Sequence, residues 1–401
     1  MVRRLPANIH MAAEVPAYPE LIRKSLHDLA DRISSGKFLE PLRLPAWDKE
    51  GWDREFQPYS KLTWHDCPWF FGETYAFRLV LQHSRYFENA IDPFGPRKEE
   101  ELRMKTPFLP IQRFVDLLPQ DIVEFFAHEE RQISTGTIPS YENIPHNTRI
   151  QVLEEALHLC MWGNKADLSF TAGGQLDHSA GDSELLLVNH DTPASRLLSG
   201  SPGTVHIVMD NSGAELAGDL ILAFALVVFG GHRVMVHPKA YPTYVSDTIV
   251  PDIHRLLEVG SSNPIPQVRH FCQMIQILID TNRITLAPDD YWCRTQFLCD
   301  MPDRIFQLFS NSLMVVVKGD FNYRRAMGDT IWEPDTPGRE AMGFQQTRIP
   351  GNSKGEPVPF LFLRTMKSDC LAGVPERVTT KLDTVEPGWR IQGRRGLIQL
   401  V

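Results

Sequence analysis

The hydrophobic positions in the first part of the chain recur at the spacing of amphipathic helices. Apolar residues stand three and four positions apart in four segments, residues 18–33, 69–87, 111–133 and 149–162. This spacing gives each helix one apolar stripe, which packs against its neighbours. We therefore expect residues 1–163 to form a helical lobe.

The pattern changes from residue 185 onward, where short apolar runs alternate with helical stretches. Four runs have the character of buried strands: residues 204–209, 233–237, 313–317 and 359–363. Alternation of strand and helix is typical of a parallel sheet with helices on both faces. The predicted fold class is α/β. Residues 164–401 are expected to form a three-layer α/β/α core with a mostly parallel sheet, preceded by the helical lobe.

Composition and charge exclude several classes of protein. Of the 401 residues, 42% are hydrophobic and 23% are charged, which is typical of a soluble globular protein. The net charge of -9, without a run of Lys or Arg, argues against a nucleic-acid-binding surface. The six scattered cysteines form no Cys-x-x-Cys pair, and the longest apolar run, residues 220–229, is too short to span a bilayer. We expect a cytoplasmic protein with neither nucleic-acid nor membrane partners, and its oligomeric state stays open.

Polar residues follow the predicted strands. They form four segments, Asp210-Asn211, Ser246-Asp247, Asp320 to Arg324 and Arg364 to Lys367. Because the carboxyl ends of parallel strands share one edge of a sheet, we expect these segments to converge on one crevice.

The side chains in these segments suit a metal ion and a phosphate group. Asp210, Asn211 and Asp247 supply carboxylate and amide oxygens, the ligands that magnesium and manganese prefer. The guanidinium of Arg364 is suited to bind two phosphoryl oxygens at once, and the ammonium of Lys367 is suited to attract a phosphoryl oxygen as a point charge. Any one segment alone is more simply a helix cap or a solvated turn. Four segments at corresponding strand ends indicate a metal-dependent phosphatase.

The same segments resemble a known family. The resemblance is carried by Asp210-Asn211-Ser212-Gly213-x-Glu215, Val245-Ser246-Asp247, Lys318-Gly319-Asp320-x-Asn322-Tyr323-Arg324 and Arg364-Thr365-x-Lys367. Residues 69–78 and 162–169 match two further segments of it. In order and spacing the chain is similar to the damage-control phosphatase family, specifically its acidic-residue-methyltransferase-like branch, for which Arg-Thr-x-Lys is a signature.

This resemblance implies a divalent metal held by Asp210, Asn211 and Asp247. It implies that a phosphorylated substrate contacts these three residues and also Glu73, Arg78, Asp320, Phe321, Asn322, Tyr323, Arg324, Arg364 and Lys367. Members of the family hydrolyse small phosphorylated metabolites, and we expect a sugar phosphate such as a fructose phosphate. They use manganese, nickel, cobalt or magnesium, of which we expect manganese.

The expected catalytic residues are Asp210 and Lys367. Lys367 and Arg324 would offset charge on the transferred phosphoryl group, because phosphoryl transfer is catalysed chiefly by positioning and electrostatics. Whether Asp210 acts as nucleophile, as base or only as a metal ligand stays open. Phe321 replaces the usual Leu of the family, and a single Arg78 stands where the family has a paired Arg, so the substrate is less defined than the metal site.

Two alternative functions remain. The branch has a reported methylation of protein carboxylates that depends on S-adenosylmethionine. The turn after the first strand argues against a methyltransferase, since this turn has one glycine and two metal-type donors rather than the glycine-rich loop that such enzymes commonly have. The second alternative is a non-catalytic protein that binds a phosphorylated metabolite. The complete set of metal-type residues argues against that function.

Overall fold

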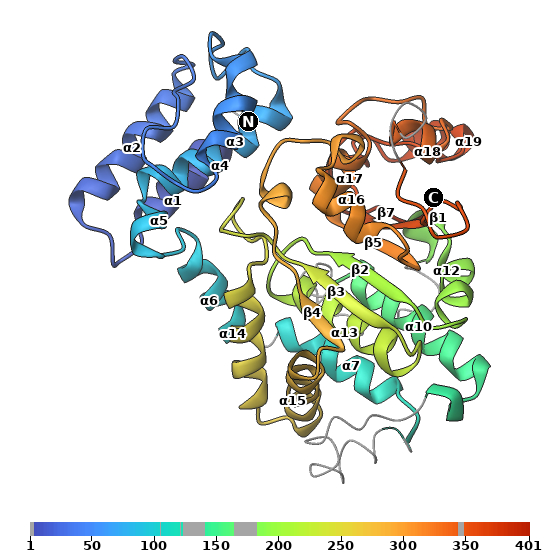
Figure 1. Cartoon of the computed structure of the whole chain (residues 1–401). Helices are drawn as coiled ribbons and strands as arrows, with labels where there is room; N and C mark the ends of the chain where they lie inside the picture. The colour runs from blue at the N-terminus through green and yellow to red at the C-terminus, as the bar shows by residue number, and fades with distance from the viewer. Residues whose placement is uncertain (1–3, 105, 121, 123–140, 164–182, 344–348) are drawn as a thin grey trace.

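Seven strands form a single sheet in the computed structural model, which describes residues 4–401 except 105, 121, 123–140, 164–182 and 344–348. The strands are β1 (Leu186–Asn189), β2 (Thr204–Val208), β3 (Arg233–His237), β4 (Ile284–Leu286), β5 (Met314–Lys318), β6 (Phe360–Thr365) and β7 (Gly396–Leu400). Their order is β1-β7-β6-β5-β2-β3-β4, and every pair is parallel except β6 with β7. The predicted α/β fold class with a mostly parallel sheet is confirmed (Figure 1).

Side chains of successive strand residues enter two different hydrophobic layers, as the two-residue period of a strand requires. Val205 and Ile207 of β2 belong to one layer, whereas Val208 belongs to the other. The first layer is built by α7 (Leu109–Leu117), α10 (His146–Met161), α12 (Asp191–Leu198), α13 (Ala214–Val228), α14 (Val250–Ser261) and α15 (Pro266–Asp280). The second is built by α16 (Asp303–Phe309), α17 (Gly319–Ala326), α18 (Gly338–Ala341) and α19 (Glu376–Val385).

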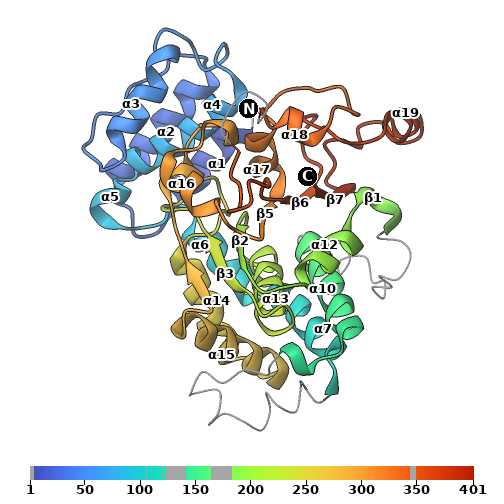
Figure 2. The same cartoon turned by 45° about the vertical axis from the view of Figure 1, so that its right-hand side comes forward.

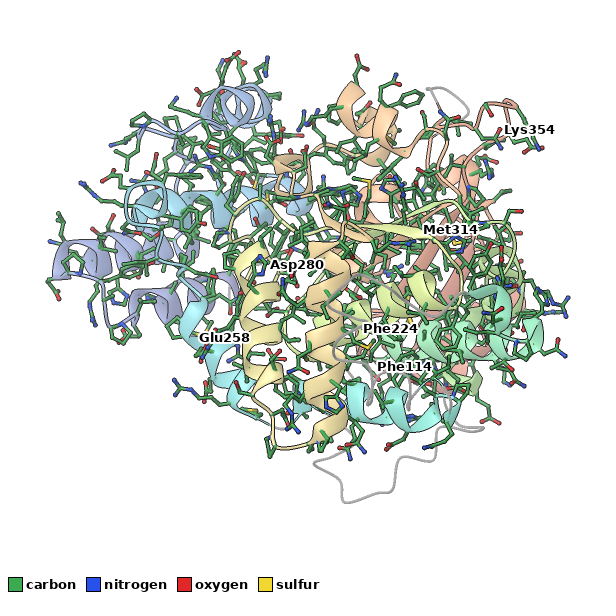
Figure 3. The ribbon with its side chains drawn as sticks, turned by 60° about the horizontal axis from the view of Figure 1, so that its bottom comes forward. Phe114, Phe224, Glu258, Asp280, Met314 and Lys354 are labelled. Carbon is green, nitrogen blue, oxygen red and sulfur yellow. The ribbon has the colours of Figure 1, made fainter. Side chains whose placement is uncertain are left out.

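Helix α13 is the central helix of the first layer. All of its residues are buried, which accounts for the apolar run over residues 220–229. Phe224 of α13 meets Phe114 of α7 edge to face, with ring centroids 6.0 Å apart, and both lie in the same layer as Met314 of β5 (Figure 3). No helix among the described residues has both the length and the apolar character that crossing a membrane requires.

The N-terminal helices have a hydrophobic core of their own. Four helices build it: α1 (Arg4–Ala13), α2 (Glu20–Ser34), α3 (Lys49–Phe56) and α4 (Trp69–His83). The short helix α5 (Tyr86–Asn89) packs on a separate small cluster, and Leu102 of α6 (Gly95–Arg103) belongs to the first layer of the sheet. The core of this lobe runs from Leu5 to Phe94, and Tyr244 and Val245 pack against it from the α/β part. Figures 1 and 2 show the lobe, in blue, on the same side of the molecule as α16 and α17.

The helices of the first 163 residues differ in detail from the prediction. The segment 69–87 is two helices, because Arg85 adopts a left-handed conformation with φ of 57° after α4. Of the segment 111–133, residues 111–117 lie in α7, and positions 121 and 123–133 lie outside the described residues. Helices α7 and α10 pack with α13 under the sheet. The division at residue 163 stays a prediction, although the packing groups these two helices with the sheet.

Strand register brings the ends of the central strands to one level. Val208 of β2 pairs with His237 of β3 on one side and with Val317 of β5 on the other. Lys318 of β5 pairs with Leu363 of β6. The turns that follow β2, β3, β5 and β6 therefore leave the sheet at the same edge, which is where the polar segments of the sequence lie.

Candidate metal and phosphate site

Asp210, Asn211 and Asp247 are brought together by backbone pairing between the turn after β2 and the segment before α14. Asn211 and Asp247 form an antiparallel bridge. The Thr248 amide donates to the Asp210 carbonyl at 2.8 Å, and the Ser212 amide donates to the Ser246 carbonyl at 2.6 Å. The two segments thus run side by side, although Asp210 and Asp247 lie 37 positions apart in the sequence.

The carboxylates of Asp210 and Asp247 are buried close to other charged side chains. Burial raises the pKa of Asp210 well above its usual value, and the nearby carboxylates of Glu215 and Asp247 raise it further. Burial also raises the pKa of Asp247 to about 6, against the opposing charge of Lys239. Glu215 also acts to raise the pKa of Asp247. Buried acids whose pKa is raised by neighbouring carboxylates are the environment that a bound cation relieves.

Asp247 has an oxygen available for a ligand. Its Oδ2 atom is buried and has no hydrogen-bond partner among the described residues, and the Lys239 ammonium approaches it at 3.4 Å. No three His, Cys, Asp or Glu side chains form a metal-binding group in the part of the chain that the structure describes. The candidate set here is instead two carboxylates and one amide, an oxygen set that suits a hard divalent cation.

Glu215 and Ser246 orient the amide of Asn211. Its Nδ2 atom donates to Asp210 Oδ2 at 3.0 Å and to Glu215 Oε2 at 3.1 Å. Its Oδ1 atom accepts from the Ser246 hydroxyl at 2.7 Å. Neither Glu215 nor Ser246 was a predicted metal ligand or substrate contact, although Ser246 lies in one of the predicted polar segments and Glu215 in the motif that carries the family resemblance. The i to i+4 spacing of Asn211 and Glu215 across the start of α13 was the available signal.

Two glycines allow close approach at this site. Gly319 begins α17 with φ of +85°, and a Cβ atom there would lie 2.0 Å from Asp210 Oδ2. Gly213 precedes α13 with φ of +66°, and a Cβ there would lie 1.8 Å from Oε1 of Glu101, which comes from α6. The Ala214 amide donates to the same Glu101 oxygen at 3.4 Å. A carboxylate of the chain therefore contacts the N-terminus of α13.

Asp320 connects the turn after β5 with the turn after β6. It accepts from Arg364 Nε at 2.8 Å, from the Lys367 amide at 3.0 Å and from the Ser368 hydroxyl at 3.1 Å. Burial acts to raise the pKa of Asp320, but Arg364 and the Lys367 amide outweigh it and the net pKa is lowered. The Lys367 side chain itself is exposed, and its charge acts on Asp210 to lower that pKa.

The guanidinium groups of Arg364 and Arg78 both bind other residues of the protein. Arg364 donates to Asp320, to the Cys370 carbonyl at 2.5 Å and to the Ser368 carbonyl at 3.1 Å. Arg78 forms a buried bidentate pair with Asp48 inside the lobe, with both distances 2.7 Å. Both were predicted to contact substrate, but their guanidinium groups are engaged in holding a loop and the lobe, respectively.

The remaining predicted residues lie on α17 and face different ways. The Asn322 amide donates to the Met209 carbonyl at 3.1 Å, and the Tyr323 hydroxyl donates to the Ala372 carbonyl at 3.2 Å, so both hold neighbouring segments. Phe321 stacks on Phe70 of α4 with ring centroids 4.8 Å apart, and Tyr244 packs against it at 4.6 Å. This aromatic contact joins the lobe to the α/β part.

Arg324 and Glu73 form a second link between α17 and the lobe. Arg324 Nε donates to Asp329 at 2.6 Å, and its Nη1 atom lies 3.8 Å from Glu73 Oε2. The guanidinium lies over the Trp69 ring, 4.1 Å from its centroid. Its Nη2 atom is buried and has no hydrogen-bond partner within the described residues. Arg4 also pairs with Glu73, at 2.5 Å.

Lys239 is a buried cation of the site that the sequence did not single out as a ligand. Its ammonium donates to the Trp292 carbonyl at 3.0 Å and lies 3.4 Å from Asp247 and 3.5 Å from the Asn322 amide oxygen. It follows β3, two residues beyond His237. The predicted segment 162–169 is described only at Trp162 and Gly163, so its residues 164–169 lie outside the described residues.

Known proteins resemble this chain over most of its length. Residues 2–382 match the family described as the damage-control phosphatase ARMT1-like domain. The chain is 26% identical over 417 residues to damage-control phosphatase ARMT1 of Xenopus tropicalis, covering 93% of this chain and 85% of the relative. It is 26% identical over 403 residues to the Homo sapiens protein of the same name, with the same coverage.

Among solved structures, a DUF89 family protein from Pyrococcus horikoshii aligns over 99% of this chain and 95% of its own, with 12% identity and a TM-score of 0.47. The family match covers far more than half of the sequence. The chain therefore belongs to the damage-control phosphatase ARMT1-like family, whose chemistry is that of a phosphatase.

Proposed function

We propose that this phosphatase is metal-dependent and hydrolyses small phosphorylated metabolites, with sugar phosphates such as fructose phosphates as substrates. The observation that carries the proposal is the arrangement of Asp210, Asn211 and Asp247, in which burial raises the pKa of both acids and Asp247 Oδ2 has no hydrogen-bond partner among the described residues. We propose manganese as the metal, with magnesium, nickel and cobalt as alternatives, because all accept oxygen ligands.

Asp210, Asn211 and Asp247 would hold the metal through their side-chain oxygens. A divalent metal bound there supplies a Lewis acid for a phosphoryl oxygen. Glu215 and Ser246 fix the Asn211 amide, and Gly319 lets the turn after β5 lie against the Asp210 carboxylate. These contacts hold the oxygen donors in place before any ligand binds, which is the preorganisation that catalysis requires.

Two cations are proposed to bind and orient the phosphate. The exposed ammonium of Lys367 acts on Asp210 and is free to reach a phosphoryl oxygen at the turn after β6. The Nη2 atom of Arg324 is buried and has no hydrogen-bond partner among the residues that the structure describes, which gives Arg324 a donor for a charged oxygen. Asp210 lies among the charges of Glu215, Asp247, Lys367 and Lys239. It either serves only as a metal ligand or also accepts a proton or the phosphoryl group, and this choice stays open.

The proposal includes a cytoplasmic location and a small-molecule substrate rather than nucleic acid or a membrane. All six cysteines are free and five of them are buried, which suits a reducing compartment. The net charge of -9 disfavours a polyanion as partner.

The test is hydrolysis by the purified, metal-stripped chain. We expect release of phosphate from p-nitrophenyl phosphate and from fructose phosphates once manganese is added, and its loss with a chelator. Asp247→Asn, which keeps the shape and removes the charge, should abolish metal-dependent turnover. Absence of hydrolysis with any of the four metals would leave the non-catalytic binding protein. Saturable S-adenosylmethionine binding without metal, measured by calorimetry, would favour the methyltransferase.

A further inference from the structure

Lys98 of α6 reaches the backbone of the segment that carries Asp247. Its ammonium donates to the Asp247 carbonyl at 2.9 Å and to Asp252 Oδ2 at 2.8 Å, and it lies 3.1 Å from Asp92 Oδ2. Three acceptors therefore surround the three hydrogens of the ammonium group. The Lys98 side chain is only 6% exposed, so these contacts are shielded from water.

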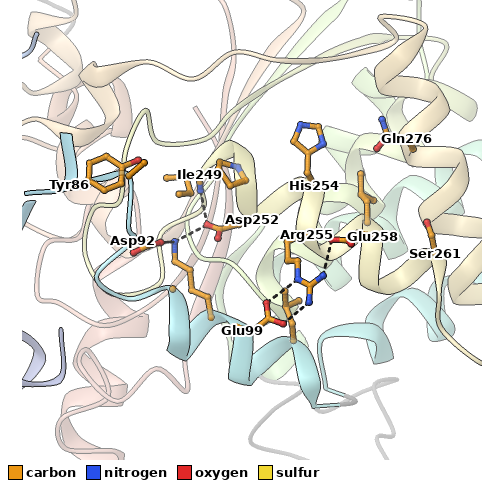
Figure 4. Close-up of a pocket in the computed structure, with 16 residues that line it drawn as sticks. Tyr86, Asp92, Glu99, Ile249, Asp252, His254, Arg255, Glu258, Ser261 and Gln276 are labelled. Carbon is orange, nitrogen blue, oxygen red and sulfur yellow. Dashed lines mark hydrogen bonds and ion pairs between the residues drawn. The ribbon is translucent and has the colours of Figure 1, made fainter. Parts of the chain in front are cut away.

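This contact lies at one end of a cavity of about 750 Å³ between α5, α6, α14 and α15. Figure 4 shows Asp92 and Asp252 at that end of the cavity, and Arg255 between Glu99 and Glu258 farther along it. Arg255 also joins α14 to α6, because its Nη2 atom lies 2.7 Å from Glu99. Lys98 and Arg255 thus connect the same two helices, and of the two only Lys98 is bonded to a residue of the proposed metal site.

The Asp247 segment is held on both sides. On one side Asp247 bridges Asn211, and on the other its carbonyl accepts from Lys98. Helix α14 begins three residues later, at Val250, and its Asp252 accepts from the Ile249 amide at 2.9 Å and from Lys98. Loss of the Lys98 ammonium would leave the buried Asp247 carbonyl and the carboxylates of Asp92 and Asp252 without this partner. The segment would then shift until these groups formed other hydrogen bonds.

We propose that Lys98 is a positioning residue of the metal site, which sets the place of the Asp247 carboxylate through its backbone carbonyl and so raises the affinity for a divalent metal. This inference rests on the proposed function. Groups that orient metal ligands without touching the metal commonly change its affinity by about 10–100-fold. No local sequence pattern indicates this contact, since Lys98 and Asp247 lie 149 residues apart.

The experiment measures binding of manganese alone to the metal-stripped full-length chain by calorimetry. We expect Lys98→Met to weaken manganese binding by about tenfold or more, and Arg255→Met to leave it unchanged. The increase in melting temperature on adding manganese should shrink only in the Lys98 variant. A merely structural role would lower the melting temperature of the metal-free protein without changing the dissociation constant for manganese.

The outcomes separate this inference from the function on which it rests. If the wild-type chain binds no manganese, magnesium, nickel or cobalt, the proposed function fails and this inference fails with it. If the wild-type chain binds manganese and Lys98→Met binds it equally well, only the positioning role is overturned. Should Lys98→Met not fold, Lys98→Gln, which keeps a shorter neutral donor, takes its place with the same two outcomes.

Discussion

Asp247 Oδ2 lies 3.4 Å from the Lys239 ammonium and has no hydrogen-bond partner in the described part of the chain. Both side chains are almost fully buried, with 5% and 0% of their surfaces exposed. Lys239 is therefore the cation that most strongly offsets the charge of this acid in the metal-free protein, and Lys98 contributes less. A bound metal would bring a second positive charge to the same carboxylate, so the charges of Lys239 and the metal would repel one another.

Lys239→Met is predicted to make the metal-free protein less stable and more responsive to metal. Removing one partner of a buried ion pair commonly lowers the free energy of unfolding by about 3–5 kcal/mol. Manganese should recover much of this loss, because it replaces the missing charge. Thermal unfolding with and without manganese checks this, and a manganese-induced shift no larger than that of the wild-type chain would contradict it.

Gly319→Ala is predicted to reduce turnover strongly. A Cβ atom at Gly319 would lie 2.0 Å from Asp210 Oδ2, so the turn or the carboxylate must move. Gly355→Ala is the matched control, because Gly355 also has a positive φ, of +79°, but open space around its Cβ position. Both variants carry backbone strain of about 1–2 kcal/mol. Measured kcat/KM should fall in the first alone, and equal losses in both would argue against contact between Gly319 and the site.

Arg78 and Arg324 are predicted to affect different properties. Arg78→Met breaks a buried pair with Asp48 and should lower the free energy of unfolding by about 3–5 kcal/mol. The KM of the folded fraction should stay the same. Arg324→Met should raise KM instead, because the Nη2 atom of Arg324 has no hydrogen-bond partner in the described part of the chain and is proposed to bind the phosphate. Urea denaturation together with steady-state kinetics separates the two, and an unchanged KM in Arg324→Met would remove that residue from substrate binding.

Acid is predicted to destabilise the fold through two buried histidines. His206 of β2 and His237 of β3 share a hydrogen bond of 2.9 Å. Burial lowers the pKa of His206 to about 3, with the His237 ring contributing, and lowers the pKa of His237 to about 4. The unfolded rings bind protons near pH 6.5 whereas the folded rings do not. Their contribution is therefore present above pH 6.5 and is lost as the pH falls toward 4.

The contribution of each ring to the free energy of unfolding should fall below pH 6.5 by up to about 1.4 kcal/mol per pH unit. Asp247, whose pKa burial raises to about 6, acts in the opposite direction, so the rings are judged from the difference between variants. Urea denaturation at pH 7, 6 and 5 measures this slope. His206→Gln should flatten it, whereas His254→Gln, at an exposed position, should not. Equal slopes in all three proteins would show that other groups cause the loss.

The central strands could be predicted from the sequence because they are buried on both faces. Residues 233–237 are β3 itself, and the runs at 204–209, 313–317 and 359–363 fall on β2, β5 and β6 to within two residues at each end. Strands β1 and β4 have only four and three residues, too few for a clear pattern. The antiparallel strand β7 pairs with β6 across the C-terminal part of the chain, and its place depends on that long-range pairing.

The candidate site was predictable where it follows strand ends, and not where it depends on distant partners. Asp210, Asn211 and Asp247 converge as the shared sheet edge requires. The pairing of Arg78 with Asp48 could not be predicted, because a guanidinium that binds phosphate and one that binds Asp48 have the same sequence signal. Lys98 was missed, because its role depends on a contact with a backbone atom far away in sequence.

The most direct test of the central claim is an anomalous diffraction map of crystals soaked in manganese. We predict a peak bound by side-chain oxygens of Asp210, Asn211 and Asp247, at the distances of about 2.0–2.3 Å that are usual for small divalent ions with oxygen ligands. A peak at another place in crystals of protein that hydrolyses phosphate esters with manganese, or no peak at saturating manganese, would contradict the account.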